Sequence, residues 1–446
     1  MTTVSTSDSI EGREPTAASP PTHDDGHKRR VILTSAIGNL IEVYDFAIYG
    51  VAAALVFPAV FFPNLSSSMG TVAAFATFGV AFVARPLGGV YFGHLGDRLG
   101  RKKTLVATLL LMGVATVLIG LLPPTSKIGI AAPIILVLLR FMQGFAAGGE
   151  WAGANLFAAE HAPKAERGRW AMFPQVGSAL AFGLGNATFL LAGLGLDEEA
   201  FQSWGWRVPF VVSAVLVVFG LYIRLKTEET PVFQRAVDGA GVARSPIVEA
   251  MKQQPRQILL ASGLGLTMGS YYYISATYMT SFAMERLDFT RNDILGASIV
   301  GGIFLVLGAL ASGLLSDRVP RRKILAAANI TAIAWSLLMF PILGLGTVYV
   351  FAACICVTLF ISGFISSPLG AFLPEQFHTR HRYSASAVSY NVSAMLGGSI
   401  PPLIAPGLVA SFGPMALGVF LAAYGTIAAV CTLALKDARS VSLDEV

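Results

Sequence analysis

Residues 93–103 read GHLGDRLGRKK, and residues 313–323 read GLLSDRVPRRK. The two segments align without a gap, and each lies at the end of a long apolar stretch. A glycine, an Asp-Arg pair, a further arginine and a closing lysine recur at matching positions. A repeat of this length predicts that the chain contains two copies of one structural unit.

The composition indicates a membrane protein. Of the 446 residues, 54% are hydrophobic and only 13% are charged, whereas about 25% of the residues of a soluble protein are charged. The apolar residues also form blocks of about 20 residues, long enough to cross a hydrocarbon core of about 30 Å. These features argue against a soluble multi-domain enzyme.

The chain contains twelve candidate membrane spans, six on either side of a polar stretch at 226–256. Each span must be helical, because lipid offers no partner to backbone amides. The fold class is therefore predicted as an all-α membrane protein with twelve transmembrane helices in two six-helix bundles, a layout typical of transporters built from repeats. The predicted spans are 32–59, 71–95, 104–122, 130–156, 170–195, 207–225, 257–283, 293–315, 324–343, 346–371, 384–410 and 415–435.

The polar segments complete the predicted domain organisation. Residues 1–30 are polar and lack the apolar region of a cleaved signal peptide, so they are predicted to form a disordered cytoplasmic tail. The amino-terminal bundle then covers 31–225 and the carboxy-terminal bundle covers 257–435. Residues 226–256 form a cytoplasmic linker, and 436–446 form a second cytoplasmic tail.

Basic residues predict the orientation. With both termini in the cytoplasm, 25 of the 31 lysines and arginines fall on the cytoplasmic side, in agreement with the positive-inside rule. The exceptions are Lys127, Arg207, Arg286 and Arg291 on the outer side, and Arg85 and Arg140 within spans. The net charge of +5 is spread over many short loops, so it does not indicate nucleic-acid binding. The three cysteines fall within spans and show no metal or disulfide pattern.

The repeated motif and the six-plus-six layout resemble the major facilitator superfamily. Four segments resemble its metabolite:proton symporter subfamily: GNLIEVYDF at 38–46, RPLGG at 85–89, RFMQGFAAGGEW at 140–151 and SWGWRVPF at 203–210. Residues 69–89 are most similar to members that transport shikimate. One departure is Val43, where the subfamily usually has tryptophan.

This resemblance implies a central cavity and a function. It implies a proton-coupled symporter in the bacterial inner membrane that imports a small organic acid, such as shikimate or a related hydroxylated ring carboxylate, by alternating access. The proton is then the coupling ion, and neither a cofactor nor an enzymatic activity is expected. The expected partners are the substrate and the lipid bilayer, and the expected state is a monomer.

Ionisable residues inside the spans are informative, because each costs at least about 2.5–3.5 kcal/mol to insert. All of them lie in the first half of the chain, and the interiors of the last six spans contain none. Charge-dependent chemistry is therefore predicted in the amino-terminal bundle. The residues are Glu42, Asp45, Arg85, Arg140 and Glu150.

Asp45 and Arg140 form the predicted proton switch. From the rise of about 1.5 Å per residue, Asp45 lies about 20 Å from the cytoplasmic start of its helix and Arg140 about 15 Å from the external start of its own, so the two could meet. Buried alone, Asp45 should hold a proton near neutral pH, and it should release that proton when it faces Arg140. A substrate carboxylate could compete for Arg140. The resemblance assigns these roles to the same two residues, and the alternative is a static ion pair between two helices.

The other buried charges allow two interpretations each. Glu42, one turn before Asp45, is either a second titrating group or a hydrogen-bonded residue in a helix interface. Arg85 is a substrate-binding candidate, or it bonds carbonyl groups freed by Pro86. Glu150 serves a gate or substrate exit, or it has a structural role near the cytoplasmic edge.

The resemblance also implies a cytoplasmic gate, built from the repeated motif and from a second internal repeat. In that second repeat, Glu160 and Arg167 follow the fourth span, and Glu375 and Arg382 follow the tenth at the same spacing. The alternative is that these charges only set the topology. The predicted gate residues are Asp97, Arg98, Arg101, Glu160 and Arg167, and more weakly Asp317, Arg318, Arg321, Glu375 and Arg382.

Neutral polar and aromatic residues of the cavity-lining spans are candidates for substrate contacts. Three consecutive tyrosines on one helix point in different directions, so at most two of them can face a cavity. The candidates are Tyr44, Tyr49, Gln143, Gln175, Tyr271, Tyr272, Tyr273, Tyr278 and Asn391.

Other functions of the same fold stay open. A symporter for citrate or another dicarboxylate would benefit from a second deep cation, for which Arg85 is the only other candidate. A betaine or proline symporter and a drug efflux pump are further alternatives. A membrane-embedded enzyme is disfavoured, because the sequence contains no metal-ligand cluster, nucleophile elbow or phosphate loop.

Overall fold

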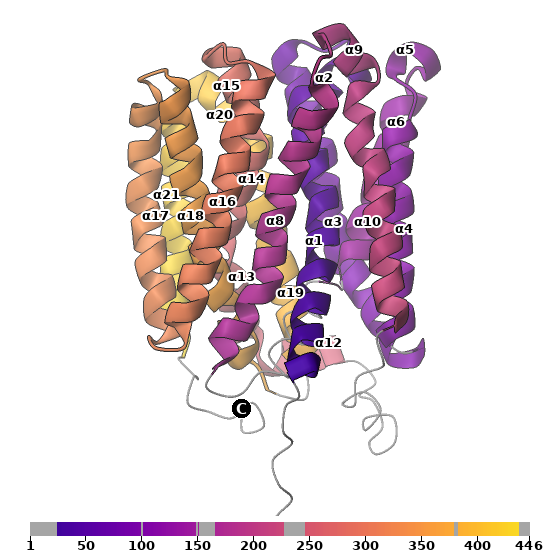
Figure 1. Ribbon diagram of the computed structural model, residues 1–446. Helices are drawn as coiled ribbons and strands as arrows, with labels where there is room; N and C mark the ends of the chain where they lie inside the picture. The colour runs from indigo at the N-terminus through magenta and orange to yellow at the C-terminus, as the bar shows by residue number, and fades with distance from the viewer. Residues whose placement is uncertain are drawn as a thin grey trace, which may run out of the picture.

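The computed structural model describes residues 25–99, 101–148, 150, 166–226, 246–378 and 382–436. Within this part of the chain every regular element is a helix. The long helices run roughly parallel to one axis, and α1 begins and α21 ends at the same end of the molecule, the lower end in Figure 1. We call this the lower end and the opposite one the upper end.

Six long helices form the first half of the molecule (Figure 1, right). Short elements link them at the upper end: α2 (Phe57–Phe61), α5 (Thr125–Ile128), α9 (Glu198–Ser203) and the 3₁₀ turn η2 (Gly205–Arg207). The long helices are α1 (Asp25–Leu55), α3 (Ser67–Leu99), α4 (Arg101–Leu121), α6 (Ala131–Ala147), α8 (Arg167–Gly193) and α10 (Val208–Lys226).

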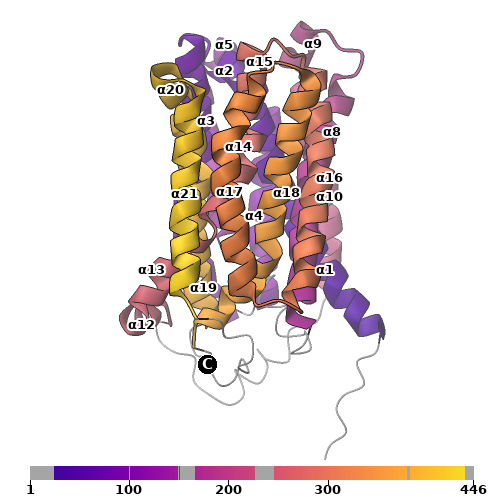
Figure 2. The same cartoon turned by 90° about the vertical axis from the view of Figure 1, so that its left-hand side faces the viewer.

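The second half repeats this arrangement with two interrupted helices (Figure 2). It is preceded by α12 (Pro246–Gln253), a short helix at the lower end within the segment predicted as a linker. Its elements are α13 (Pro255–Leu264), α14 (Leu266–Ala276), α15 (Tyr278–Arg286), α16 (Arg291–Ser316), α17 (Arg321–Leu343), α18 (Val348–Phe372), η3 (Pro374–Gln376), α19 (Arg382–Ala394), η5 (Met395–Ser399), α20 (Ile400–Phe412) and α21 (Pro414–Ala434).

The twelve predicted spans correspond to these helices. In the described residues, ten helical spans are long and apolar enough to cross a membrane, and α6 is a shorter apolar helix. The predicted span 257–283 is divided among α13, α14 and α15. The predicted fold class, an all-α membrane protein with two six-helix bundles, is confirmed.

Two helices of the second half are interrupted for identifiable reasons. The backbone leaves helical geometry at Gly265, which ends α13, and at Thr277, where φ is −126° and ψ is −77°. Between α19 and α20 the helix widens into the π-helical turn η5. Pro401 and Pro402 follow this turn at the start of α20, and neither has an amide proton to donate to the preceding turn.

Glycines bring α3 and α6 into close contact within the first half. A Cβ atom added to Gly144 would lie 2.0 Å from the carbonyl oxygen of Ala81, and one added to Gly148 would lie 2.1 Å from that of Arg85. Only glycine permits this approach of two backbones, as is typical of membrane helix pairs. The contact fixes α6, which carries Arg140, against α3, which carries Arg85.

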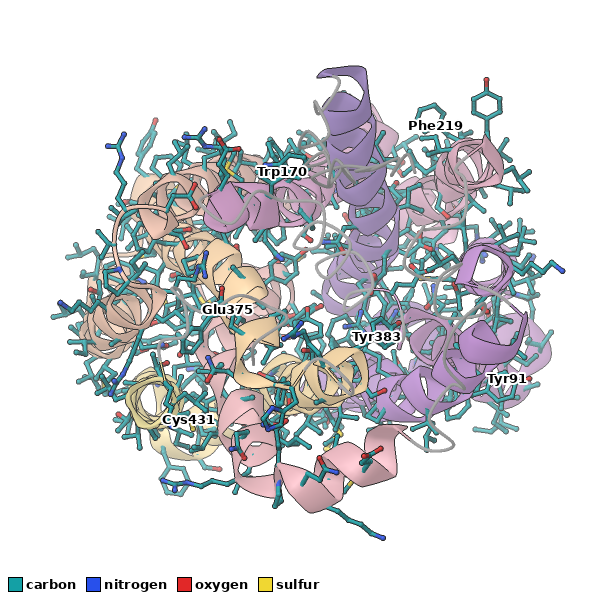
Figure 3. The ribbon with its side chains drawn as sticks, turned by 90° about the horizontal axis from the view of Figure 1, so that it is seen from below. Tyr91, Trp170, Phe219, Glu375, Tyr383 and Cys431 are labelled. Atoms are coloured by element: carbon teal, nitrogen blue, oxygen red, sulfur yellow. The ribbon has the colours of Figure 1, made fainter. Side chains whose placement is uncertain are left out.

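The two halves meet along two seams. One seam joins α8 to α16, where a Cβ atom on Gly302 would lie 3.0 Å from the Cα atom of Gly183. The other joins α3 to η5 and α20. Seen from the lower end, Glu375 and Cys431 lie in the second half, and Tyr91 and Phe219 lie in the first (Figure 3).

Candidate functional site

A buried chain of hydrogen bonds joins three helices in the middle of the first half. Arg140 Nη1 donates to Gln143 Oε1 at 2.9 Å, and Gln143 Nε2 donates to Thr116 Oγ1 at 2.7 Å. Thr116 Oγ1 in turn donates to Asp45 Oδ2 at 2.5 Å. All four side chains are at most 1% exposed. Asp45 and Arg140 therefore belong to one network, but they are linked through two neutral side chains and form no direct ion pair.

The guanidinium of Arg140 lies among aromatic rings. Its central carbon is 4.0 Å from the ring centroid of Tyr49, 4.4 Å from that of Phe46 and 4.9 Å from that of Phe78. These cation–π contacts offset part of the cost of burial. Nε and Nη2, the two donors along one edge of the guanidinium, are buried and have no hydrogen-bond partner among the described residues.

Glu42 forms the direct ion pair of this region, and its partner is Arg85. Arg85 Nη2 lies 2.9 Å from Glu42 Oε1, and both side chains are at most 3% exposed. The Arg85 guanidinium also stacks over Phe46, with its carbon 4.3 Å from the ring centroid. Tyr390 of α19, in the other half, interacts with the same guanidinium. The pair thus joins α1 to α3 and contacts the second half.

A pocket of about 70 Å³ lies between the two halves, with room for several water molecules. Tyr272 and Ser393 belong to its wall, and both are at most 9% exposed. Their hydroxyl groups have no hydrogen-bond partner among the residues that the structure describes. Tyr273 also lines it and interacts electrostatically with Glu42, Arg85 and Arg140. The polar and aromatic lining residues are Gln175, Ser178, Tyr272, Tyr273, Ser362, Ser366, Tyr390 and Ser393.

The structure places the predicted substrate residues in different environments. Gln175, Tyr272 and Tyr273 line the pocket, whereas Tyr49 and Gln143 contact Arg140 and are not part of the pocket wall. The Tyr49 hydroxyl is bound to Thr77 at 2.6 Å.

Other predicted residues lie away from the pocket. Tyr44 is hydrogen-bonded to Thr188 and to the Pro209 carbonyl, and Tyr271 donates to the Ala332 carbonyl, so both face the interior of their own half. Tyr278 is buried in α15 and is not part of the pocket wall. These three tyrosines lie outside the pocket wall, and their contact with substrate stays a prediction. The sequence could not distinguish them from the pocket-lining tyrosines, because it does not give the direction of a side chain around its helix.

Asn391 and Glu150 have contacts near the lower end. Asn391 Nδ2 donates to the carbonyl oxygen of Gly148 at 2.8 Å, which bridges the two halves. Glu150 is 5% exposed and accepts a 2.7 Å hydrogen bond from Thr108 on α4. Neither residue lines the pocket. Asn391 joins the two halves, whereas the hydrogen bond of Glu150 to Thr108 lies within the first half.

The second copy of the predicted gate is described in full. Arg321 and Glu375 form a buried ion pair, and Arg382 Nε donates to the carbonyls of Pro374 and Phe377. Asp317 accepts from the backbone amides of Gly168 and Arg169 at the start of α8, at 2.9 and 3.3 Å, and so binds the positive end of a helix in the other half.

Burial raises the pKa of Asp317, while the two amide protons act to lower it. Arg318 is exposed. In the first copy of the gate, Glu160 lies outside the described residues, as do the side chains of Asp97, Arg98, Arg101 and Arg167.

The sequence did not single out Thr116, Tyr390 or Ser393. All three are neutral, and single hydroxyl groups in apolar helices give no periodic or charge signal. The one signal that could have identified Thr116 is its position, since it is one of few polar residues in the middle of the third predicted span. In the part of the chain that the structure describes, no three His, Cys, Asp or Glu residues come together as metal ligands.

Comparisons with known proteins identify relatives over nearly the whole chain. A family model described as the Major Facilitator Superfamily matches residues 36–402. The chain is 41% identical to the inner membrane metabolite transport protein YhjE of Escherichia coli, over 93% of this chain and 96% of that protein. It is 37% identical to the Escherichia coli shikimate transporter, over 92% of this chain and 95% of the transporter. A proline/betaine transporter of Salmonella typhimurium is 36% identical, over 93% of this chain and 84% of its own.

A solved structure has the same fold. The proton:xylose symporter XylE bound to 6-bromo-6-deoxy-D-glucose superposes with a TM-score of 0.73, covering 95% of this chain and 99% of that one, at 16% identity. A partially occluded inward-open form of XylE from Escherichia coli gives a TM-score of 0.68 over 92% of this chain and 97% of its own, also at 16% identity.

Proposed function

The chain belongs to the major facilitator superfamily and is a membrane transporter of metabolites, and from this premise we propose that it imports a small organic acid together with protons. The substrate class that fits best is a hydroxylated ring carboxylate such as shikimate. Transport follows alternating access, in which the pocket between the halves opens first to one side of the membrane and then to the other. The distribution of basic residues supports a cytoplasmic lower end, and with it cytoplasmic termini in a bacterial inner membrane.

The free edge of Arg140 is the observation that carries this proposal. Nε and Nη2 lie along one edge of the guanidinium, and neither has a hydrogen-bond partner in the part of the chain that the structure describes. Two parallel donors of this kind match the two oxygens of a carboxylate. Tyr273 interacts electrostatically with Arg140 and also lines the pocket, so the pocket wall lies close to this guanidinium. Arg85 is less suited to this role, because Glu42 already pairs with it.

The pocket wall also supplies neutral hydroxyl groups. Those of Tyr272 and Ser393 have no partner in the described structure, and each can donate or accept a hydrogen bond. Ring hydroxyls of a substrate could satisfy them, whereas an unsubstituted ring would leave buried polar groups unpaired, at a cost of about 1–3 kcal/mol each. This arrangement favours a hydroxylated acid over a plain aromatic one.

Asp45 is the proposed proton site. It is buried with one oxygen bound to Thr116, while Oδ1 has no hydrogen-bond partner. A carboxylate in this position is stabilised by the positive charge of Arg140, which lies at the other end of the hydrogen-bonded series through Gln143 and Thr116. A substrate anion bound to Arg140 neutralises that charge, and Asp45 then takes up a proton. The substrate and the proton are therefore transported together.

A second candidate substrate class is a zwitterion such as betaine or proline. The proline/betaine transporter relative supports it, as do the rings of Tyr272 and Tyr273, because aromatic faces attract quaternary ammonium groups. A dicarboxylate or citrate is disfavoured by the pairing of Arg85 with Glu42, which removes the second free cation.

The proposal can be tested by ligand binding to purified protein. A thermal-shift screen should include shikimate, quinate, protocatechuate, citrate, 2-oxoglutarate and betaine, since a specific ligand raises the unfolding temperature by mass action. We expect shikimate or quinate to stabilise the protein.

Arg140→Lys should abolish that stabilisation and weaken the affinity by about 10- to 100-fold, because an ammonium group cannot form the two-pronged contact. Arg256→Lys, at an exposed position, serves as the control. Stabilisation by betaine alone would favour the second candidate. An unchanged affinity in Arg140→Lys would rule out the carboxylate site.

A further inference from the structure

We propose that Thr116 and Gln143 carry the coupling between anion and proton, by relaying the charge state of Arg140 to Asp45 along one directional hydrogen-bonded chain. The inference rests on the proposed function and adds two positioning residues to it. Neither residue touches the pocket wall, and neither is ionisable.

The direction of the chain follows from its members. Arg140 can only donate, so the carbonyl oxygen of Gln143 must face it and the amide nitrogen must face Thr116. The Thr116 oxygen thereby accepts from Gln143 and has its single proton left to donate. That proton points to Asp45 Oδ2, and every bond in the chain runs from the cation to the carboxylate.

Thr116 also has an alternative acceptor. Its oxygen lies 3.0 Å from the carbonyl oxygen of Met112, one turn earlier on α4, compared with 2.5 Å from Asp45. One hydroxyl proton cannot serve both acceptors fully. Thr116 can therefore support ionised Asp45 by donating to it, or turn to Met112 when Asp45 is protonated, without movement of any heavy atom.

An anion on the free edge of Arg140 would act on this chain from its far end. Neutralising the guanidinium removes the charge assistance from its bond to Gln143, and aligned hydrogen bonds polarise one another. The Gln143 amide then donates less strongly to Thr116, and Thr116 less strongly to Asp45. The ionised form of Asp45 loses support, and a proton from water binds to it.

Among the described residues, few other charged groups face Asp45. Those that act on it are Arg140 and Glu150, and Tyr44 interacts with it from the same helix. Ser213 of α10 lies beside it, but neither its hydroxyl nor Asp45 Oδ1 has a partner with good hydrogen-bond geometry.

The helices packed against α1 add little charge at this depth. On α3, Arg85 is paired with Glu42, and α14 has no charged residue. On α4, α8 and α10 the charged residues lie near the helix ends, and Glu285 and Arg286 lie at the end of α15. The chain from Arg140 is thus the main polar route to Asp45.

A double-mutant cycle without any substrate tests the relay. The protonation of Asp45 is followed by infrared spectroscopy as the carboxylic acid C=O band that Asp45→Asn removes, between pH 4 and 10. The variants are Arg140→Met, which mimics neutralisation, Thr116→Val, which removes the hydroxyl while keeping the shape, and the double variant. Thr432→Val is the matched control, because Thr432 is buried and bonds only to the backbone of its own helix.

We expect Thr116→Val to move the midpoint of the band upward by about one to two pH units, since a hydrogen bond to the charged form is lost. Arg140→Met should move it upward as well, and the double variant should add little to the shift of Thr116→Val alone. Thr116→Ser should retain the normal midpoint, and Thr432→Val should leave it unchanged.

Two outcomes would contradict the inference, and they differ from failure of the proposed function. Additive shifts in the double variant would show that Arg140 acts on Asp45 through space. An unchanged midpoint in Thr116→Val would show that the hydroxyl has no influence. If no titrating band depends on Asp45, the proton site fails and the proposed function fails with it.

Discussion

Glu42 and Asp45 lie one turn apart on α1, yet they face different helices. Glu42 reaches Arg85 on α3, and Asp45 reaches Thr116 on α4. The sequence could place all the buried charges in the first half, because charge in an apolar span is costly and easily recognised. It could not assign the pairs, because the helical rise gives depth along the axis and not direction around it.

The Glu42–Arg85 pair gives a prediction about stability. Glu42→Gln leaves a buried cation without its partner, which should cost about 3–5 kcal/mol of unfolding free energy. The double variant Glu42→Gln/Arg85→Gln removes both charges and should recover a large part of that loss. Thermal and denaturant unfolding in detergent can measure the cycle.

A loss in the double variant equal to the sum of the two single losses would mean that the two groups do not stabilise each other. Glu249→Gln, on the lower-end helix α12, is the control with a partly exposed carboxylate and should change stability by less than about 0.5 kcal/mol.

At the scale of helices, glycine spacing decides how α3 and α6 pack. Apolar stretches of about 20 residues predicted nearly all the helices, since length and hydropathy suffice for a membrane span. The interruptions at Gly265 and Thr277 and the π-helical turn at Met395–Ser399 were not predicted. Single glycines and prolines occur in many membrane helices, and neighbouring helices determine which of them distort the backbone.

Two glycine substitutions should have effects of opposite sign. Gly144→Ala places a methyl group 2.0 Å from the Ala81 carbonyl oxygen, so α3 and α6 must separate at a cost of about 1–3 kcal/mol. At Gly296 on α16 a Cβ atom meets nothing within 4 Å, so Gly296→Ala should stabilise its helix by about 0.5–1 kcal/mol. Unfolding temperatures in detergent compare the two, and equal effects would contradict the packing described here.

At the scale of the whole molecule, the two halves touch at both ends of the pocket. At the upper end the Ser281 hydroxyl donates to the Ala54 carbonyl at 3.4 Å, and Arg291 pairs with Glu198 at 3.2 Å. At the lower end Asp317 holds the start of α8, and Asn391 holds Gly148. Alternating access requires that one set of contacts breaks while the other persists. The repeated motif predicted a contact region at the lower end, but only the structure shows that Asp317 caps a helix of the opposite half.

The two halves contribute different kinds of side chain to the site. Buried charge at mid-depth lies in the first half, and the described pocket wall of the second half offers hydroxyl groups and aromatic rings. This division was predicted from the sequence, since it depends on residue types in each span. The link from Arg140 to Asp45 through Thr116 and Gln143 could not be predicted, because it depends on side chains from three helices meeting at one point.

The most direct test of the account compares driven accumulation with exchange in proteoliposomes that contain Asp45→Asn. The central claim is that Asp45 carries the transported proton while Arg140 binds the substrate anion. Accordingly, Asp45→Asn should lose accumulation of labelled shikimate under an inward proton gradient, yet keep a substantial part of the exchange of labelled for unlabelled shikimate. Normal gradient-driven accumulation by this variant would contradict the claim.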